Sequence, residues 1–433
     1  MEETVKSKSN LDKIDIVMTT DENYILQTRV TIWSMAKASA AEYEYRIHVL
    51  CDGALSPVSR NKLLEMEYLF DNISIHFIEV ERSIFEKSKL TSFYTMASYY
   101  RLIMTEVIEA EKCVFLDGDI IVRTDISELF QTDLEGSYIA GVPDCGIRCR
   151  LERFLEHQKI INLPTMDKYV NAGVLVWNLK KMREDNLYLK FLSYIGEGYP
   201  SMDNDILNKC CYGKIKLLNI KYNFFAEFFG REGKLKEGGY SDGELHDLNE
   251  NEMIIHFSGR FKPWEYVRVN RSEIWWNAAR EALAESDYVA MYDAAKSLSV
   301  QSDWSYLLEK IGQYKDIIIV GFSDIGKNVA DALLWREANK IGCFCDNDRK
   351  KQGKIYKQKE VLSIEGANEN YPCGLWIITS QNYHREIKKQ LEYMGIGIDR
   401  IIRYVDKSEA YYEAVDDRYQ ELEEKEKVLR TGG

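Results

Sequence analysis

Short runs of apolar residues alternate with longer amphipathic stretches through the first third of the chain. Apolar or β-branched runs of about four to eight residues favour strands, whereas apolar residues three and four positions apart favour helices. The predicted strands are residues 14–19, 45–50, 73–78 and 112–116, and the predicted helices are residues 28–40, 59–70 and 98–108. Strands separated by helices form a largely parallel sheet, so an α/β domain is expected here.

The same alternation resumes near residue 316, with predicted strands at 316–320, 340–345 and 375–379 and a helix at 325–337. A chain of 433 residues exceeds the size at which one hydrophobic core keeps growing, so two domains are expected. The predicted parts are a first domain at 12–285, a helical connector at 286–311, a smaller Rossmann-like α/β domain at 312–406, and a charged helical tail at 407–433.

A glycine-rich stretch at 230–243 interrupts the pattern and is predicted to be a surface loop or a lid.

Composition narrows the function classes. The net charge of -13 argues against nucleic acid as a partner, because that binding depends on neutralising phosphates with Lys and Arg. Residues 1–12 lack the apolar core of a signal peptide, and no later run has the length of a membrane span, so a cytoplasmic location is expected. The nine cysteines show no repeated C-x-x-C spacing, which favours reduced, mostly buried thiols.

In open α/β sheets, ligands bind beyond the carboxyl ends of the strands, and two polar segments follow strands directly. One is residues 19–24, and the other is Asp117-Gly118-Asp119. Two carboxylates at the ends of such a turn suit a hard divalent cation, and the glycine lets a diphosphate and metal approach the backbone. The alternative is that both aspartates are turn and cap residues after a buried strand.

Residues 254–264 place His256 at the end of a short apolar strand, followed by Gly259, Lys262 and Pro263. An imidazole can complete a metal site that two carboxylates begin, and it suits Mn²⁺ better than Mg²⁺. The predicted metal ligands are therefore Asp117, Asp119 and His256, and Lys262 can reach a pyrophosphate. The alternative for His256 is a partly buried ring with a structural role.

Six motifs in this order resemble those of glycosyltransferase family eight, which includes bacterial lipopolysaccharide galactosyl- and glucosyltransferases and glycogenin. They are residues 19–24, 98–102, 115–119, 170–174, 203–208 and 256–264. The resemblance covers roughly residues 12 to 280. It implies a GT-A type fold with a mixed, mainly parallel sheet. It also implies retaining transfer of glucose or galactose from a UDP-sugar, with Mn²⁺ or Mg²⁺, to a glycan or lipid-linked saccharide of the cell surface.

The same resemblance assigns the first motif to the uracil and ribose pocket, with Tyr24 stacking on the base. The residues of this pocket are Thr19, Thr20, Asp21, Asn23 and Tyr24. The alternative is a turn in which Thr20 or Asp21 caps the following helix. Arg101 would contact the donor diphosphate or sugar, or it could be a snorkelling arginine on an amphipathic helix.

Asn171, Ala172 and Asp203 would face the donor, as would Gly118 and Gly259 beside its diphosphate. Asn204 stands where the family usually has glutamine, near the anomeric carbon, and is shorter by one methylene. The expected catalytic residues are Asn204, Asp203 and Lys262. A front-face mechanism and a double displacement through Asp203 both stay open.

Five basic residues interleave with aromatic residues at 260–280, which suits either a membrane headgroup interface or core packing. In the second domain, residues 321–326 resemble a Rossmann fingerprint in which Ser323 replaces the middle glycine. Asp346 follows the next predicted strand, where the fingerprint has an acid that binds a ribose. Nucleotide binding there and a structural or partner-docking role both stay open. A homo-oligomer stays open as well.

The main alternative for the whole chain is a catalytically inactive nucleotide-sugar-binding or scaffold protein. An NAD-dependent oxidoreductase is disfavoured, because the fingerprint is imperfect and no recognisable hydride-transfer domain follows it.

Overall fold

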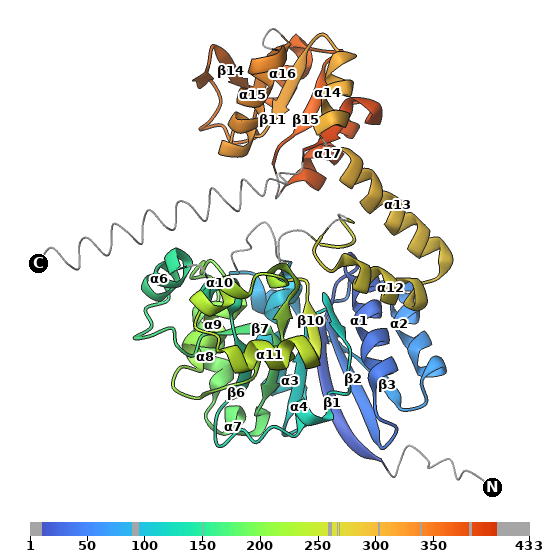
Figure 1. Ribbon diagram of the computed structural model, residues 1–433, viewed down its shortest axis with the longest axis vertical. Helices are drawn as coiled ribbons and strands as arrows, with labels where there is room; N and C mark the ends of the chain where they lie inside the picture. Colours follow the sequence, from blue (N-terminus) through green and yellow to red (C-terminus); the bar gives the residue numbers. More distant parts are fainter. Residues whose placement is uncertain are drawn as a thin grey trace, which may run out of the picture. The chain divides into compact units, whose positions relative to one another are not determined.

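The computed structural model describes residues 11–88, 95–149, 151–258, 262–265, 267, 269–301, 304–337, 340–380 and 383–404. It consists of two compact units (Figure 1). The first ends at Ala290, and the second begins at Met291 and also includes Trp264–Val267.

The first unit is built on a seven-stranded sheet in the order β3-β2-β1-β4-β7-β6-β8. Its strands are β1 (Asp12–Thr19), β2 (Tyr43–Cys51), β3 (Ile73–Glu79), β4 (Cys113–Leu116), β6 (Ile139–Pro143), β7 (Val170–Trp177) and β8 (Ile215–Leu217). Strand β7 runs antiparallel to both of its neighbours, and the other described pairs are parallel. The expected mixed, mainly parallel sheet is therefore confirmed.

Helices cover both faces of this sheet. The helices and turns of the unit are α1 (Ile25–Ala38), α2 (Pro57–Leu69), η2 (Arg82–Phe85), η3 (Met96–Ile103), α3 (Met104–Val107), α4 (Ser127–Phe130), α5 (Cys145–Arg148), α6 (Leu151–Ile160), α7 (Leu179–Glu184), α8 (Leu187–Tyr194), α9 (Met202–Cys210), η4 (Ile220–Tyr222), η5 (Ala226–Phe228) and α12 (Ser272–Ala282). The helix predicted at 98–108 is instead mostly a 3₁₀ helix, followed by a single α turn. Alternation along β1 separates two cores, because successive side chains of a strand point to opposite faces.

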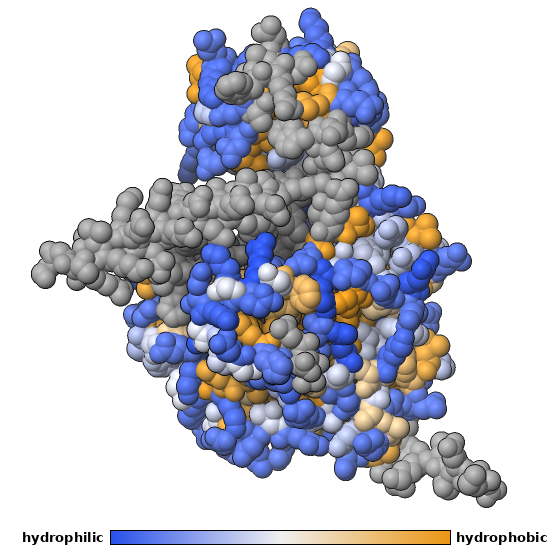
Figure 2. Space-filling view, in the orientation of Figure 1, coloured by the Kyte–Doolittle hydropathy of each residue, from blue (hydrophilic) through white to orange (hydrophobic). Residues whose placement is uncertain are grey.

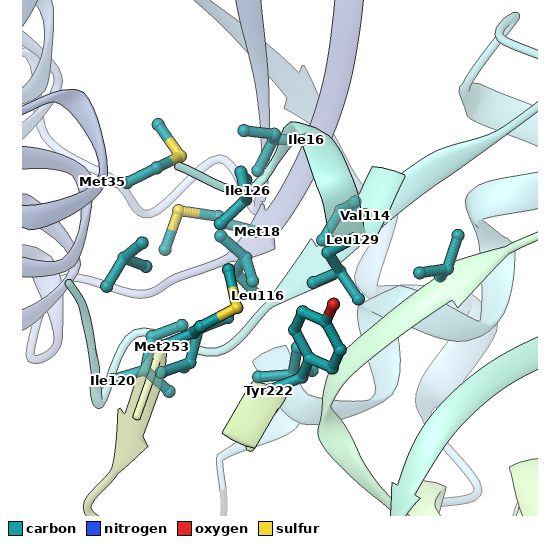
Figure 3. Close-up of a cluster of buried hydrophobic side chains, with 14 of the residues drawn as sticks. Ile16, Met18, Met35, Val114, Leu116, Ile120, Ile126, Leu129, Tyr222 and Met253 are labelled. Atoms are coloured by element: carbon teal, nitrogen blue, oxygen red, sulfur yellow. The ribbon is translucent and has the colours of Figure 1, made fainter. Parts of the chain in front are cut away.

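One of these cores lies between β1, β4 and helices α1 and α2. Met18 of β1, Leu116 of β4 and Met253 belong to it (Figure 3). Leu116 is fully buried and directly precedes Asp117, so the core fixes the end of the strand from which the candidate carboxylates emerge.

A small second sheet lies at that strand end, in the order β5-β10-β9. It consists of β5 (Ile120–Val122), β10 (Ile254–His256) and β9 (Phe224–Phe225). Strand β10 is antiparallel to β5 and parallel to β9, with His256 opposite Ile120 and Phe225. This pairing brings residues from three distant parts of the chain together.

The stretch predicted as a surface loop or a lid contains helices, so the loop prediction is wrong. It contains α10 (Glu232–Glu237) and the start of α11 (Asp242–Asn251). Ser241 and Glu244 form a reciprocal capping box at the start of α11, which outweighs the low helix propensity of Gly243.

The second unit has a six-stranded sheet in the order β13-β14-β12-β11-β15-β16, parallel except for the β13–β14 pair. Its elements are α13 (Glu285–Gln301, shared with the first unit), α14 (Trp304–Gly312), β11 (Ile317–Val320), α15 (Asp324–Glu337), β12 (Ile341–Cys345), β13 (Ile355–Tyr356), β14 (Lys359–Leu362), α16 (Ile364–Asn370), β15 (Leu375–Ile378), α17 (His384–Tyr393), η6 (Ile398–Arg400) and β16 (Ile401–Arg403). This second α/β unit agrees with the Rossmann-like expectation. The predicted tail lies outside the described residues.

The turn at residues 321–326, which resembles the Rossmann fingerprint, forms contacts with other parts of the second unit. A Cβ on Gly326 would lie 2.2 Å from the carbonyl oxygen of Gly321, so the glycine permits close contact between helix and strand. The carboxylate of Asp346 accepts the amide of Phe322 at 2.8 Å and pairs with Lys351 at 3.0 Å. The residue expected to bind a ribose is thus already bonded to this turn.

The tryptophans of the basic and aromatic segment belong to the interior. Trp264, Trp275 and Trp276 are buried, so core packing is the correct interpretation for these rings. The visible face of both units is mostly hydrophilic, with hydrophobic residues in small separate groups (Figure 2). Within the described residues, no helix combines the length and the apolar character needed to cross a bilayer. All nine cysteines are free thiols, and seven of them are buried, as predicted.

Candidate functional site

Three side chains with metal-binding atoms converge where β4, β5 and β10 meet. Asp117 follows β4, Asp119 precedes β5 and His256 ends β10. Nε2 of His256 lies 3.1 Å from a carboxylate oxygen of Asp119 and 4.0 Å from one of Asp117. One potential ligand atom from each residue lies within 4.8 Å of the others. Two hard oxygens and one imidazole nitrogen fit a divalent ion such as Mn²⁺.

Gly173 makes room for this cluster. A Cβ on Gly173 would lie 2.4 Å from Cε1 of His256 and 2.7 Å from Oδ2 of Asp117. The backbone of Gly173 also accepts the amide of Asp117 at 2.8 Å, which ties the carboxylate turn to β7. A side chain at this position would therefore displace two of the three candidate ligands.

Among the described residues, Lys262 is the basic side chain that lies closest to the cluster. Its ammonium donates to Asp119 at 2.6 Å and to the carbonyl oxygen of Phe257 at 2.6 Å. Burial by itself would raise the pKa of Asp119, but Lys262 and then His256 outweigh burial and hold that pKa well below its usual value. Asp119 is therefore an ionised carboxylate throughout the physiological pH range.

Arg101 joins the cluster to α9. Its guanidinium donates to Asp117 at 2.8 Å and pairs with Asp203 at 3.0 Å. It also donates to the carbonyl oxygen of Ala172 at 2.7 Å and lies over the ring of Phe115. At 4% exposure it is buried, so it is not a snorkelling arginine.

Asp203 is a buried carboxyl group with 4% exposure. Burial raises its pKa to about 7, Arg101 opposes this rise, and the charge of Asp117 adds to it. Asp203 therefore changes charge near neutral pH when no cation is bound nearby.

The neighbouring Asn204 is held in one orientation. The hydroxyl of Tyr169 donates to Asp205, so its oxygen accepts from Nδ2 of Asn204 at 2.8 Å. Oδ1 of Asn204 is then a buried acceptor with no hydrogen-bond partner among the described residues. Buried acceptors are normally paired, so this oxygen is a candidate contact for a ligand hydroxyl.

The 19–24 segment lies against the same turn. A Cβ on Gly118 would meet the ring of Tyr24 at 3.2 Å and Oγ1 of Thr28 at 3.0 Å. Asp21 accepts the amide of Asn23 at 2.9 Å, and the N-cap of α1 is Tyr24, with no side-chain cap bond. Neither Thr20 nor Asp21 therefore caps α1, and the capping interpretation is wrong.

The remaining predicted site residues have the following positions. Thr19 ends β1, Asn171 and Ala172 lie near the start of β7, and Gly259 lies outside the described residues. Sequence reasoning did not single out Asn223, which contacts His256, or Tyr169, which orients Asn204. No local motif marks either residue, because both act through partners that are distant in the chain.

Comparison with known proteins concerns the first unit. The model of the family described as glycosyl transferase family 8 matches residues 15–268. General stress protein A of Bacillus subtilis is 28% identical over 260 residues, which are 58% of this chain and 86% of that protein. The lipopolysaccharide 1,2-glucosyltransferase of Escherichia coli is 23% identical over 276 residues, which are 62% of this chain and 78% of that protein.

Among solved structures, galactosyltransferase LgtC in complex with donor and acceptor sugar analogs is 25% identical to the chain. The match covers 64% of this chain and 100% of that one, with a TM-score of 0.54.

Proposed function

Because the chain belongs to glycosyl transferase family 8, we propose that it transfers glucose or galactose from a UDP-sugar, with Mn²⁺ and with retention at the anomeric carbon. The chain is a glycosyltransferase with the GT-A type fold expected from its sequence. The proposed cation rests on one observation, the convergence of Asp117, Asp119 and His256, whereas the proposed donor and stereochemistry rest on family membership. The proposed acceptor is a glycan or glycolipid of the cell surface, by analogy with the lipopolysaccharide glucosyltransferase.

Asp117, Asp119 and His256 would hold the cation, which as a Lewis acid would stabilise the charge that develops on the departing diphosphate. Lys262 would add a second positive charge beside the diphosphate once the cation has replaced its ammonium as the partner of Asp119. The 19–24 segment would bind the uridine, with the ring of Tyr24 beside Gly118 as the stacking surface.

Asn204 would accept a hydrogen bond from a donor-sugar hydroxyl through its unpaired oxygen. Asp203 pairs with Arg101, which lowers its reactivity as a nucleophile and supports a front-face mechanism over a double displacement. In that mechanism the bond from the anomeric carbon to the phosphate oxygen breaks while the acceptor oxygen bonds on the same face. The acceptor proton passes to the leaving phosphate.

The test is UDP release from a panel of UDP-sugars, with and without Mn²⁺. We expect UDP-glucose or UDP-galactose to give the highest rate and Asp119→Ala to abolish it, while Asp133→Ala, which removes an exposed turn carboxylate, retains it. UDP binding without turnover of any sugar would favour the inactive scaffold protein. Full activity of Asp119→Ala would refute the proposed metal site.

A further inference from the structure

A row of hydrogen bonds runs from Asp144 through two asparagines to His256, and it is fully buried at the histidine end. Nδ2 of Asn171 donates to Asp144 at 3.1 Å. Nδ2 of Asn223 donates to Oδ1 of Asn171 at 2.9 Å, and Oδ1 of Asn223 lies 2.8 Å from Nδ1 of His256. Asn223 is 0% exposed and His256 3%, so water does not compete for the bond between these two side chains.

The ends of this row fix its direction. The amide of Gly173 can only donate, and it donates to Oδ1 of Asn171 at 3.0 Å. Asp144 offers an acceptor on the other side of the Asn171 amide, and its second oxygen already caps α5 by accepting the amide of Ile147 at 2.9 Å. The side-chain oxygen of Asn171 therefore faces Asn223 and accepts a hydrogen bond from its Nδ2. The side-chain oxygen of Asn223 then faces His256.

An oxygen facing Nδ1 requires that this nitrogen carries the proton. We propose that Asn223 is a positioning residue that holds the proton of His256 on Nδ1, and thereby keeps Nε2 available to a cation between Asp117 and Asp119. Gly173 and Asp144 fix the orientation of the Asn171 amide, and that amide in turn fixes the orientation of Asn223. The side-chain oxygen of Asn171 therefore accepts hydrogen bonds from the protein and not from the donor sugar. This inference rests on the proposed metal site and names residues that maintain it.

The opposite tautomer would block the site. A proton on Nε2 would be donated to Asp119, only 3.1 Å away, and the nitrogen would then be lost as a ligand. The edge-on ring of Phe225, with its centroid 5.2 Å from that of the imidazole, packs against the ring but does not choose between its nitrogens. Hydrogen-bond direction is therefore the feature that selects the tautomer.

The first test reads the tautomer itself. Long-range ¹H–¹⁵N spectra of the full-length, metal-free chain at about pH 8.5, roughly two units above the usual histidine pKa, distinguish a protonated from an unprotonated Nδ1. The spectrum of His256→Gln assigns the signal. We expect a protonated Nδ1 in the unaltered chain, an unprotonated Nδ1 in Asn223→Leu, and a protonated Nδ1 again in Asn223→Asp, which restores the acceptor.

The matched control is Asn178→Leu. Asn178 follows the other end of β7, where its side chain accepts the amide of Lys181 at 3.0 Å and donates to Ser137 at 3.2 Å. This variant loses comparable structural bonds, so its thermal stability falls while its His256 spectrum stays unchanged. An unprotonated Nδ1 in the unaltered chain, or a protonated one in Asn223→Leu, would overturn the proposal.

The second test measures the affinity for Mn²⁺ in the presence of UDP by calorimetry. Loss of a partner that orients a metal-binding histidine typically weakens metal affinity by about 10–100-fold, which is the loss expected for Asn223→Leu but not for Asn178→Leu. Unchanged affinity in Asn223→Leu would overturn the proposal. If the unaltered chain binds no Mn²⁺ with UDP, the proposed function fails, while the spectra still decide the role of Asn223.

Discussion

The ammonium of Lys262 lies 2.6 Å from Asp119, a carboxylate that the proposed cation would also bind. We predict that Lys262→Ala lowers kcat by about two orders of magnitude, since a charge-assisted contact to a developing anion is worth roughly 2–4 kcal/mol. The same variant should bind Mn²⁺ at least as tightly, because the competing ammonium is gone. Steady-state kinetics and calorimetry check the two parts.

Lys180→Ala is the control for this prediction, because it removes an exposed lysine paired with Glu111. It should leave both kcat and Mn²⁺ affinity unchanged. A near-normal kcat in Lys262→Ala would dismiss the assigned role.

Asp203 gives a prediction about stability and pH. Its folded-state pKa of about 7 lies above the usual aspartate value of 3.8, so the folded chain keeps a proton that the unfolded chain releases. The stabilisation of the folded state by this proton is complete below the unfolded-state pKa of 3.8 and is lost as pH rises to about 7. The free energy of unfolding then falls by at most about 1.4 kcal/mol per pH unit. Asp203→Asn should therefore gain roughly 2 kcal/mol relative to the unaltered, metal-free chain between about pH 5.5 and 7.5.

Urea unfolding at the two pH values measures this difference. Asp125→Asn is the control. Burial by itself would raise the pKa of Asp125, but hydrogen bonds from Ser127, Tyr45 and Ala40 outweigh burial and hold that pKa below its usual value, so that carboxylate is ionised in both states across the window. Its stability difference from the unaltered chain should not change with pH. A pH-independent difference for Asp203→Asn would contradict the assignment.

At the scale of elements, β7 contributes to the site mainly through Gly173, which has no side chain and leaves room for the cluster. Gly173→Ala should push His256 and Asp117 apart, because the added Cβ would lie 2.4 Å and 2.7 Å from their atoms. We expect the affinity for Mn²⁺ with UDP to fall by roughly tenfold or more, as when the orientation of a ligand is lost. Calorimetry measures this affinity.

Gly53→Ala is the matched glycine control, since nothing lies within 4 Å of the added Cβ. It should retain the affinity of the unaltered chain. If Gly173→Ala does so too, the close approach at β7 is not what forms the site.

The elements predicted best are those with an unbroken apolar run. Strand β4 was predicted within one residue, because four consecutive buried positions leave a clear apolar run. The predicted loop at 230–243 failed because its glycines were weighed above a capping box that is visible in the sequence at Ser241 and Glu244. The two-residue strand β9 has no local signal, since its only support is pairing with β10.

At the scale of the whole molecule, the two units have separate hydrophobic cores. The buried clusters around β1 and β4 belong to the first unit, and those around β11 and β15 belong to the second. We predict that a fragment ending before residue 312 hydrolyses UDP-sugar with the metal requirement of the full chain, because every candidate donor-site residue precedes Pro263. Limited proteolysis should select the end point, since a cut within α13 or α14 can expose apolar surface.

The readout is UDP release by the purified fragment and by the full chain. A well-folded but inactive fragment that regains activity when the second unit is added separately would show that this unit contributes to catalysis.

The sequence by itself determined the fold class, the succession of strands and helices, and the identity of Asp117, Asp119 and His256. These features depend on hydrophobic periodicity and on motifs that act over a few residues. Only the tertiary structure decided which partners orient these candidate ligands. Asn223 reaches His256 across 33 positions and Asn171 across 52, and the direction of such bonds follows from the chemistry of both ends. Hydrogen-bond direction between distant residues leaves no periodic trace in the chain, so it is visible only once the strands have been brought together.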